Sequence, residues 1–263
     1  MRSLLSGLAS FLLCWLVAGS LPVQAESPGE LPADALARRL FHRAVGQDMQ
    51  MAGTMMLIDA QGHQRLRSYQ TLRRDADGQR QVLIRFTAPA DIAGTAFLVL
   101  ESVATGETEQ HLYLPALKRS RRIVASQKGR SFVNSDFTYE DMQRQPLENW
   151  TYRLAEPQTC LERPCQVLVS TPKPATDTAY GQVMTWVDEA TAMPLKIEFY
   201  DPELRHCKSY RVERFSLVEG IATEMVVVME DLRSGHQTSL RTEQIRYNSG
   251  LPASLFTTRA LEP

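Results

Sequence analysis

The sequence lacks the short motifs that mark many enzyme active sites. It contains no Gly-x-Ser-x-Gly elbow for a serine nucleophile, and no glycine-rich phosphate loop follows an expected strand and opens a helix. The 5 histidines are scattered, and the cysteines lack the second ligand pair of a zinc site. We therefore expect no enzyme activity, no metal and no cofactor. A hidden active site stays an alternative: it would place His111 or His206 beside a serine or carboxylate, whereas a carrier pocket would be apolar throughout.

An excess of charge of either sign is also missing. The chain has 29 Lys and Arg against 30 Asp and Glu, a net charge of −1. A nucleic-acid partner would require a dominant positive field, so we expect none. Positive charge is dense at one place only, which we call the basic segment: Lys118, Arg119, Arg121 and Arg122. This segment is interpreted in two ways, as a contact for lipid headgroups or a partner protein, or as an edge strand protected by charge from aggregation.

Long hydrophobic runs are absent beyond the first residues. Arg2 is followed by an apolar run over residues 4–17 and by small residues before and at Ala25. This pattern predicts a secretory signal peptide over residues 1–25, cut after Ala25, and hence a periplasmic protein. No later stretch approaches the ~20 apolar residues of a membrane-spanning helix.

Cysteine is scarce, and three cysteines follow the expected cleavage site. Cys160 and Cys165 flank a short turn-like insert between two strand patterns. In an oxidising compartment this spacing predicts a disulfide between them, with two unpaired thiols as the alternative. Cys207 is expected to be a buried free thiol.

Helical patterns are rare, and strand patterns dominate. One short helix is expected before Gly46, with Pro32 in its first turn and Leu36 and Leu40 on its apolar face. Short connections join the many strand patterns that follow, and such connections require antiparallel pairing. A long twisted antiparallel sheet curls on itself. We therefore predict a mainly β protein with one domain over residues 26–263. Its single antiparallel sheet would curl into an incomplete barrel, with the helix at the mouth.

Alternation along the early strands predicts an apolar interior. Side chains two residues apart share a face, so the same-face residues of neighbouring strands converge. The residues expected to line an apolar cavity are Met51, Met55, Val82, Ile84, Phe86, Phe97 and Val99. Methionine is flexible and polarizable, which suits a cavity for lipids of variable shape. Ordinary core filling explains the same pattern, and both interpretations stay open.

Several segments resemble one protein family. They are Tyr113-Leu114-Pro115 with the basic segment, Ser135 to Asp141, and the stretch from Trp186-Val187-Asp188 to Tyr200-Asp201. Together they resemble a branch of the LolA-like family of outer-membrane lipoprotein-sorting proteins, over roughly residues 36–261. The resemblance implies an incomplete barrel of about eleven strands, with helices and lid segments closing it over a hydrophobic cavity. It also implies binding of acyl chains.

The expected function is that of a periplasmic carrier or chaperone. It would bind acyl chains of lipoproteins or free lipids and transfer them toward the outer membrane, acting as a monomer between an inner-membrane transporter and an outer-membrane acceptor. One alternative is an accessory of a lipid exporter of the resistance-nodulation-division kind. Another is a sensor of lipid or misfolded protein that acts on an envelope-stress regulator.

Overall fold

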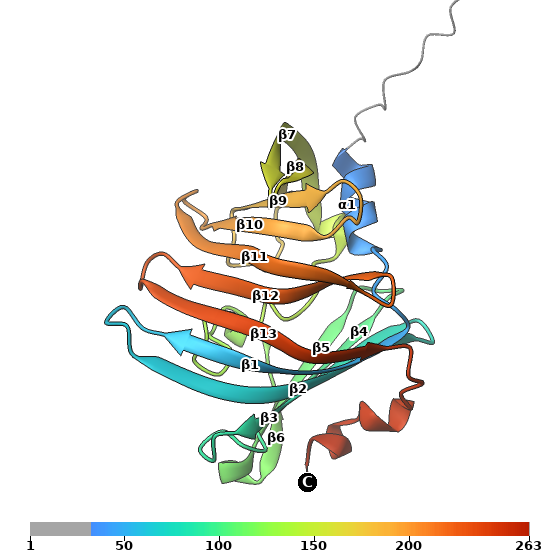
Figure 1. Cartoon of the computed structure of the whole chain (residues 1–263), viewed down its shortest axis with the longest axis vertical. Coiled ribbons are helices and arrows are strands. Elements are labelled where there is room, and N and C mark those ends of the chain that lie inside the picture. The colour runs from blue at the N-terminus through green and yellow to red at the C-terminus, as the bar shows by residue number, and fades with distance from the viewer. Residues whose placement is uncertain (1–32, 263) are drawn as a thin grey trace, which may run out of the picture. The chain divides into compact units, whose positions relative to one another are not determined.

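The structure is a computed structural model that describes residues 33–262, and the expected signal peptide lies outside them. One sheet of 13 antiparallel strands makes up most of the described chain (Figure 1). The strands are β1 (Asp48–Ile58), β2 (Gln64–Ala76), β3 (Gln79–Ala88), β4 (Ala96–Ser102), β5 (Thr108–Leu114), β6 (Arg119–Arg122), β7 (Trp150–Cys160), β8 (Arg163–Pro172), β9 (Gln182–Asp188), β10 (Pro194–Tyr200), β11 (His206–Val218), β12 (Ile221–Asp231) and β13 (His236–Tyr247).

The helices are few and short. The one α-helix of the described residues is α1 (Ala33–Phe41), and the 3-10 helices are η1 (Pro115–Leu117), η2 (Ala125–Gln127), η3 (Leu147–Asn149), η4 (Ala253–Leu255) and η5 (Thr258–Leu261). Leu36 and Ala37 of α1 pack against Leu168 of β8 and Val187 of β9, as the expected apolar face requires. None of the described helices has the length and hydropathy needed to cross a membrane.

The order of the strands leaves the sheet open. Strands follow one another as in the sequence, except that the first and last strands pair, with Met49 opposite Tyr247. The free edges are therefore β6 and β7, which are adjacent in the chain but do not pair. The predicted incomplete antiparallel barrel is confirmed, with 13 strands instead of about eleven.

Residues 123–149, which we call the crossing segment, join the two free edges and pack inside the curve of the sheet. Phe132 of this segment lies 4.9 Å, ring centroid to ring centroid, from Phe97 of β4. Asp141 of the same segment binds Lys208 of β11. One short segment thus touches strands from both halves of the sheet, so the sheet must wrap around it.

The half of the sheet formed by β1–β5 has a filled interior. Its buried cluster includes Ile84, Phe86 and Phe97, and the aromatic rings of Phe132 and Tyr139 close over them. The opposite face of these strands is covered by the C-terminal segment, in which Phe256 and Leu261 pack on Leu83, Ala96, Leu98 and Tyr113. Both faces of this half therefore carry a buried apolar cluster.

Replacing Phe97 by alanine should lower the free energy of unfolding by about 3–5 kcal/mol, the usual cost of deleting a buried aromatic ring. Phe97 is 0% exposed and its ring packs against Phe132 and Tyr139. Denaturant unfolding measures the loss, with Leu66→Ala on an exposed position of β2 as the control. A loss no larger than that of the control would mean that the space around Phe97 is already open.

Candidate functional site

A cavity of about 670 Å³ lies on the inner face of the other half of the sheet. It is bounded by α1 and the residues that follow it, by the crossing segment, and by strands β7–β12. This volume is within the range of about 300–1,000 Å³ that is typical of small-molecule sites. The cavity is the candidate functional site.

Strand register builds the apolar wall of the cavity. Side chains of directly paired residues on neighbouring strands point to the same face of the sheet. A chain of such pairs forms one row of side chains across the five strands β8–β12. The row is Leu168, Thr185, Ile197, Tyr210 and Met229. Phe199 lies two residues from Ile197 and lines the same cavity, as do Trp150 and Tyr152 of β7. A chain of methylene groups would find apolar contacts along this wall.

The cavity has a charged end where α1 leads into β1. Arg43, Asp75, Arg80 and Arg144 line it there. Arg144 binds Glu101, with its Nε 2.8 Å from Oε1, and its guanidinium carbon lies 4.2 Å from the centroid of the Phe41 ring. The expectation of a pocket that is apolar throughout is therefore wrong, because this end presents three arginines.

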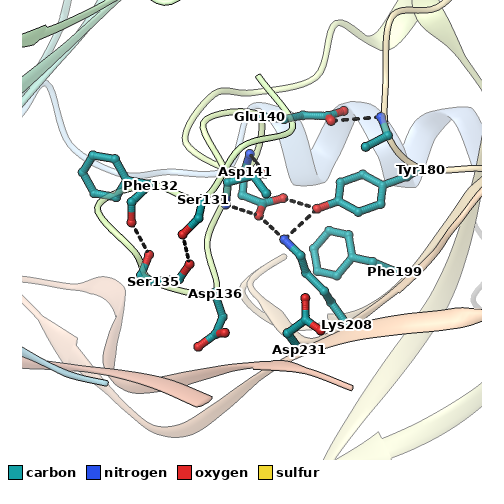
Figure 2. A network of polar contacts seen from close by, with 12 residues as sticks. Ser131, Phe132, Ser135, Asp136, Glu140, Asp141, Tyr180, Phe199, Lys208 and Asp231 are labelled. Carbon is teal, nitrogen blue, oxygen red and sulfur yellow. Dashed lines mark hydrogen bonds and ion pairs between the residues drawn. The ribbon is translucent and has the colours of Figure 1, made fainter. Parts of the chain in front are cut away.

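A buried polar network fastens the crossing segment beside the cavity (Figure 2). Lys208 Nζ lies 2.7 Å from Asp141 Oδ2, and it also donates to the Tyr180 hydroxyl at 2.9 Å. The Tyr180 hydroxyl donates to Asp141 Oδ1 at 2.7 Å. Burial and the adjacent Asp141 carboxylate raise the pKa of Tyr180 well above its ordinary value, so the phenol keeps the proton that it donates.

Two further acids of the crossing segment are also anchors. Glu140 accepts hydrogen bonds from the Thr178 hydroxyl and from the backbone N–H of Ala179, at 3.0 Å in the second case. Asp136 accepts from the Thr238 hydroxyl at 2.6 Å. Burial raises the pKa of both carboxyls. Glu140 is buried, so it acts inside the protein and not on its surface.

The sequence and the fold were compared with those of known proteins. One family model, described as an uncharacterized protein, matches residues 78–263. The chain belongs to that family. No curated protein matches the sequence.

Solved structures share the fold over most of their length. A Vibrio parahaemolyticus domain, provisionally assigned as an outer membrane lipoprotein-sorting protein, is 28% identical with a TM-score of 0.81, covering 88% of this chain and 98% of its own. A DUF1329 family protein from Desulfovibrio piger is 29% identical with a TM-score of 0.81, covering 87% and 97%. A LolA superfamily protein from Nitrosomonas europaea, 22% identical with a TM-score of 0.65 and covering 87% and 98%, shows the fold alone. The predicted LolA-like resemblance is confirmed.

The residues predicted to line a cavity lie in the filled half of this LolA-like sheet. Met55, Ile84, Phe86, Phe97 and Val99 are buried in the cluster that Phe132 and Tyr139 close, and Met51 and Val82 pack at its border. Val82 and Val99 also line a smaller cavity of about 180 Å³ beside the crossing segment. Contact of these residues with a ligand stays a prediction. The wall of the larger cavity comes from later strands, which the sequence did not single out.

The basic segment occupies the free edge of the sheet. Arg119, Arg121 and Arg122 belong to β6, which pairs with β5 on one side only, and Lys118 precedes it in the left-handed conformation. All four side chains are exposed. Arg122 Nη2 lies 3.1 Å from Glu109 Oε1 in an exposed ion pair. This position is compatible with both interpretations of the segment.

The predicted disulfide is not formed in this structure, where Cys160, Cys165 and Cys207 are free cysteines. In the register of the β7–β8 hairpin, Cys160 is opposite Arg163 and Cys165 is opposite Gln158, so the two cysteines are diagonal neighbours. Their side chains are in hydrogen-bond contact as thiols. Burial raises the pKa of Cys165 to about 12, so its thiol stays protonated. Cys207 is buried, as predicted.

The two histidines named for a hidden active site make only local contacts. His206 Nε2 lies 2.9 Å from the Ser209 hydroxyl, three residues away, and His111 Nε2 lies 3.4 Å from Glu109 Oε2. Neither histidine lines the cavity. Among the described residues, no cluster of metal-ligating side chains is present either.

Replacing Asp141 by asparagine should destabilise the protein by about 3–5 kcal/mol, because it leaves the buried Lys208 ammonium without its counter-ion. The double variant Asp141→Asn with Lys208→Met should recover much of that loss. Denaturant unfolding measures both, and Glu213→Gln in the exposed pair with Arg211 is the control, with an expected change of about 0–1 kcal/mol. Equal losses in the control and in Asp141→Asn would show that the network does not anchor the crossing segment.

Proposed function

We propose that the protein is a periplasmic carrier that shelters acyl chains of lipoproteins or free lipids in the cavity beside α1. The single observation that supports this function most is the cavity itself, whose apolar wall is a cross-strand row in a sheet of the LolA-like family. The neighbouring Vibrio protein is provisionally assigned to lipoprotein sorting. An accessory of a lipid exporter or a sensor would use the same cavity with a different partner.

The expected affinity suits a carrier that must also release its cargo. Each buried methylene contributes about 0.8 kcal/mol, so sheltering ten of them gives about 8 kcal/mol before ordering costs. That free energy corresponds to a dissociation constant of roughly micromolar. No covalent chemistry is required of the protein, because binding and release alone move the lipid.

Filling the cavity should abolish lipid binding and spare the fold. Ile197 is half-buried in the middle of the cavity wall, so Ile197→Trp places the indole in space that is already open. Fluorescent fatty-acid binding should be lost while the midpoint of thermal unfolding changes little. Leu112→Trp, in the filled half, is the matched control and should cost about 1–3 kcal/mol by overpacking.

The parent protein must bind lipid for this comparison to have meaning. Native mass spectrometry of the protein purified from the periplasm weighs any lipid that it retains. A parent protein that carries no lipid and binds no fatty acid would rule out the carrier function.

We also propose that the basic segment contacts anionic headgroups or an acidic partner during transfer. Its four cations lie together on a free sheet edge in a protein of nearly neutral charge. Such a patch attracts anionic surfaces over about 10 Å at 0.1 M salt.

Reversing Arg119, Arg121 and Arg122 to glutamate should slow lipid transfer to anionic vesicles, most strongly at low salt. The matched control reverses Arg65, Arg153 and Arg246, which are exposed elsewhere on the sheet. Transfer rates are measured by fluorescence dequenching at two salt concentrations for both triple variants. A slower rate in the basic-segment variant alone shows a local effect, because both variants change the net charge equally. If the two triple variants behave alike, only the edge-protection interpretation remains.

A further inference from the structure

Among the described residues at the charged end of the cavity, Arg80 is the one cation whose side chain donates no hydrogen bond. It belongs to β3 and is opposite Asp75 of β2 and Glu101 of β4, so its side chain lies between two carboxylates on the inner face. It lines both the large cavity and the smaller one beside it. Its side chain is only 21% exposed.

Each of the two neighbouring carboxylates also has another arginine beside it. Asp75 Oδ2 lies 2.9 Å from Arg73 Nε. Glu101 Oε1 receives hydrogen bonds from two nitrogens of Arg144, with Nε at 2.8 Å. Arg80 is left with an ion pair to Asp75 at 3.7 Å, too long for a hydrogen bond, and it donates no hydrogen bond within the described residues.

A guanidinium in this position is an unsatisfied donor at the charged end of a cavity whose other walls are largely apolar. Arginine has five N–H donors in a fork that matches the oxygens of a carboxylate or phosphate. Burial lowers the pKa of Arg80 to about 10, and Asp75 opposes that shift. The side chain is therefore still charged near neutral pH, and an anion that reached it would be held at low dielectric.

Two other donors that line the cavity are weakly paired or unpaired. Arg43 lines it with only a 3.5 Å contact to Glu224. Trp150 also lines it, and its buried Nε1 has no acceptor among the described residues. The lining acids are committed elsewhere, since Asp141 binds Lys208 and Glu140 binds Thr178 and Ala179. These N–H donors of Arg80, Arg43 and Trp150 would be satisfied by a ligand that carries acceptor oxygens.

We propose that the cavity selects a single-chain amphiphile with an anionic oxygen headgroup, a carboxylate or a phosphate, held by Arg80 while the alkyl chain lies along the row from Leu168 to Met229. This inference rests on the proposed carrier function and narrows its substrate class. The chain supplies affinity through burial, and Arg80 supplies the preference for charge. A neutral amphiphile of the same length would leave the guanidinium unpaired.

The test compares three ligands with the same sixteen-carbon chain: palmitate, hexadecyl phosphate and hexadecanol. Their affinities are measured by displacement of a fluorescent fatty acid from the full chain at pH 8. A charge-assisted hydrogen bond is worth about ten-fold or more in affinity. The parent protein should therefore prefer at least one of the anionic ligands to hexadecanol by about ten-fold or more, and the ratio between the two shows which headgroup fits.

Two variants of Arg80 locate the preference. Arg80→Gln should bring the affinities for all three ligands to within about three-fold of one another, leaving that for hexadecanol unchanged, and Arg80→Lys should retain part of the preference because it keeps the charge. Arg153→Gln, exposed on β7, removes an equal charge away from the cavity and should change nothing.

The outcomes separate this inference from the function on which it rests. Equal binding of the three ligands by the parent protein would overturn the headgroup selection and leave the carrier function intact. A preference that survives in Arg80→Gln would overturn the role of Arg80. No binding of any ligand would count against the carrier function itself. If Arg80→Gln does not fold, the ligand ratios of the parent and of Arg80→Lys decide the question.

Discussion

The packing of the crossing segment against both halves of one open sheet is the contact on which the rest of the structure depends. In this antiparallel sheet of 13 strands the two edge strands, β6 and β7, do not pair, so no backbone ladder closes the curve. Residues 123–149 supply that constraint from inside. Their aromatic side chains pack on β3 and β4, and their carboxylates bind β11, β13 and the loop before β9. Because β1 and β13 hold the two halves together by backbone pairing, removing either set of contacts would loosen the curl of the sheet without separating its halves.

This arrangement divides the interior into a filled half and an open half. Phe132 and Tyr139 occupy the space over β1–β5 and pack in the buried cluster there. Later residues of the segment line the cavity together with the row on β8–β12. Most of the cavity wall therefore comes from the later strands, while Asp75 and Arg80 of the first half line its charged end.

Much of the fold could be predicted from the sequence, because apolar and polar residues alternate along most of the long strands. The strand β6 was only one of two interpretations of the basic segment, since Arg-Ser-Arg-Arg has no apolar alternation and pairs because β5 lies beside it. Alternation also indicated which early side chains share a face. It could not show that Phe132, distant in sequence, fills the space before them. The role of Asp141 was hidden for the same reason, because its partner Lys208 lies on a strand that follows much later.

The pairing of β1 with β13 has a consequence for how the chain folds. Of the described strands, β1 is synthesised first and β13 last, yet they are neighbours in the sheet. Until β13 arrives, β1 presents an unpaired edge of backbone donors and acceptors, which is a template for wrong pairing with other chains. Contacts between such distant residues also slow folding. A nascent chain of this topology therefore gains from any factor that shields the β1 edge until the last strand closes it.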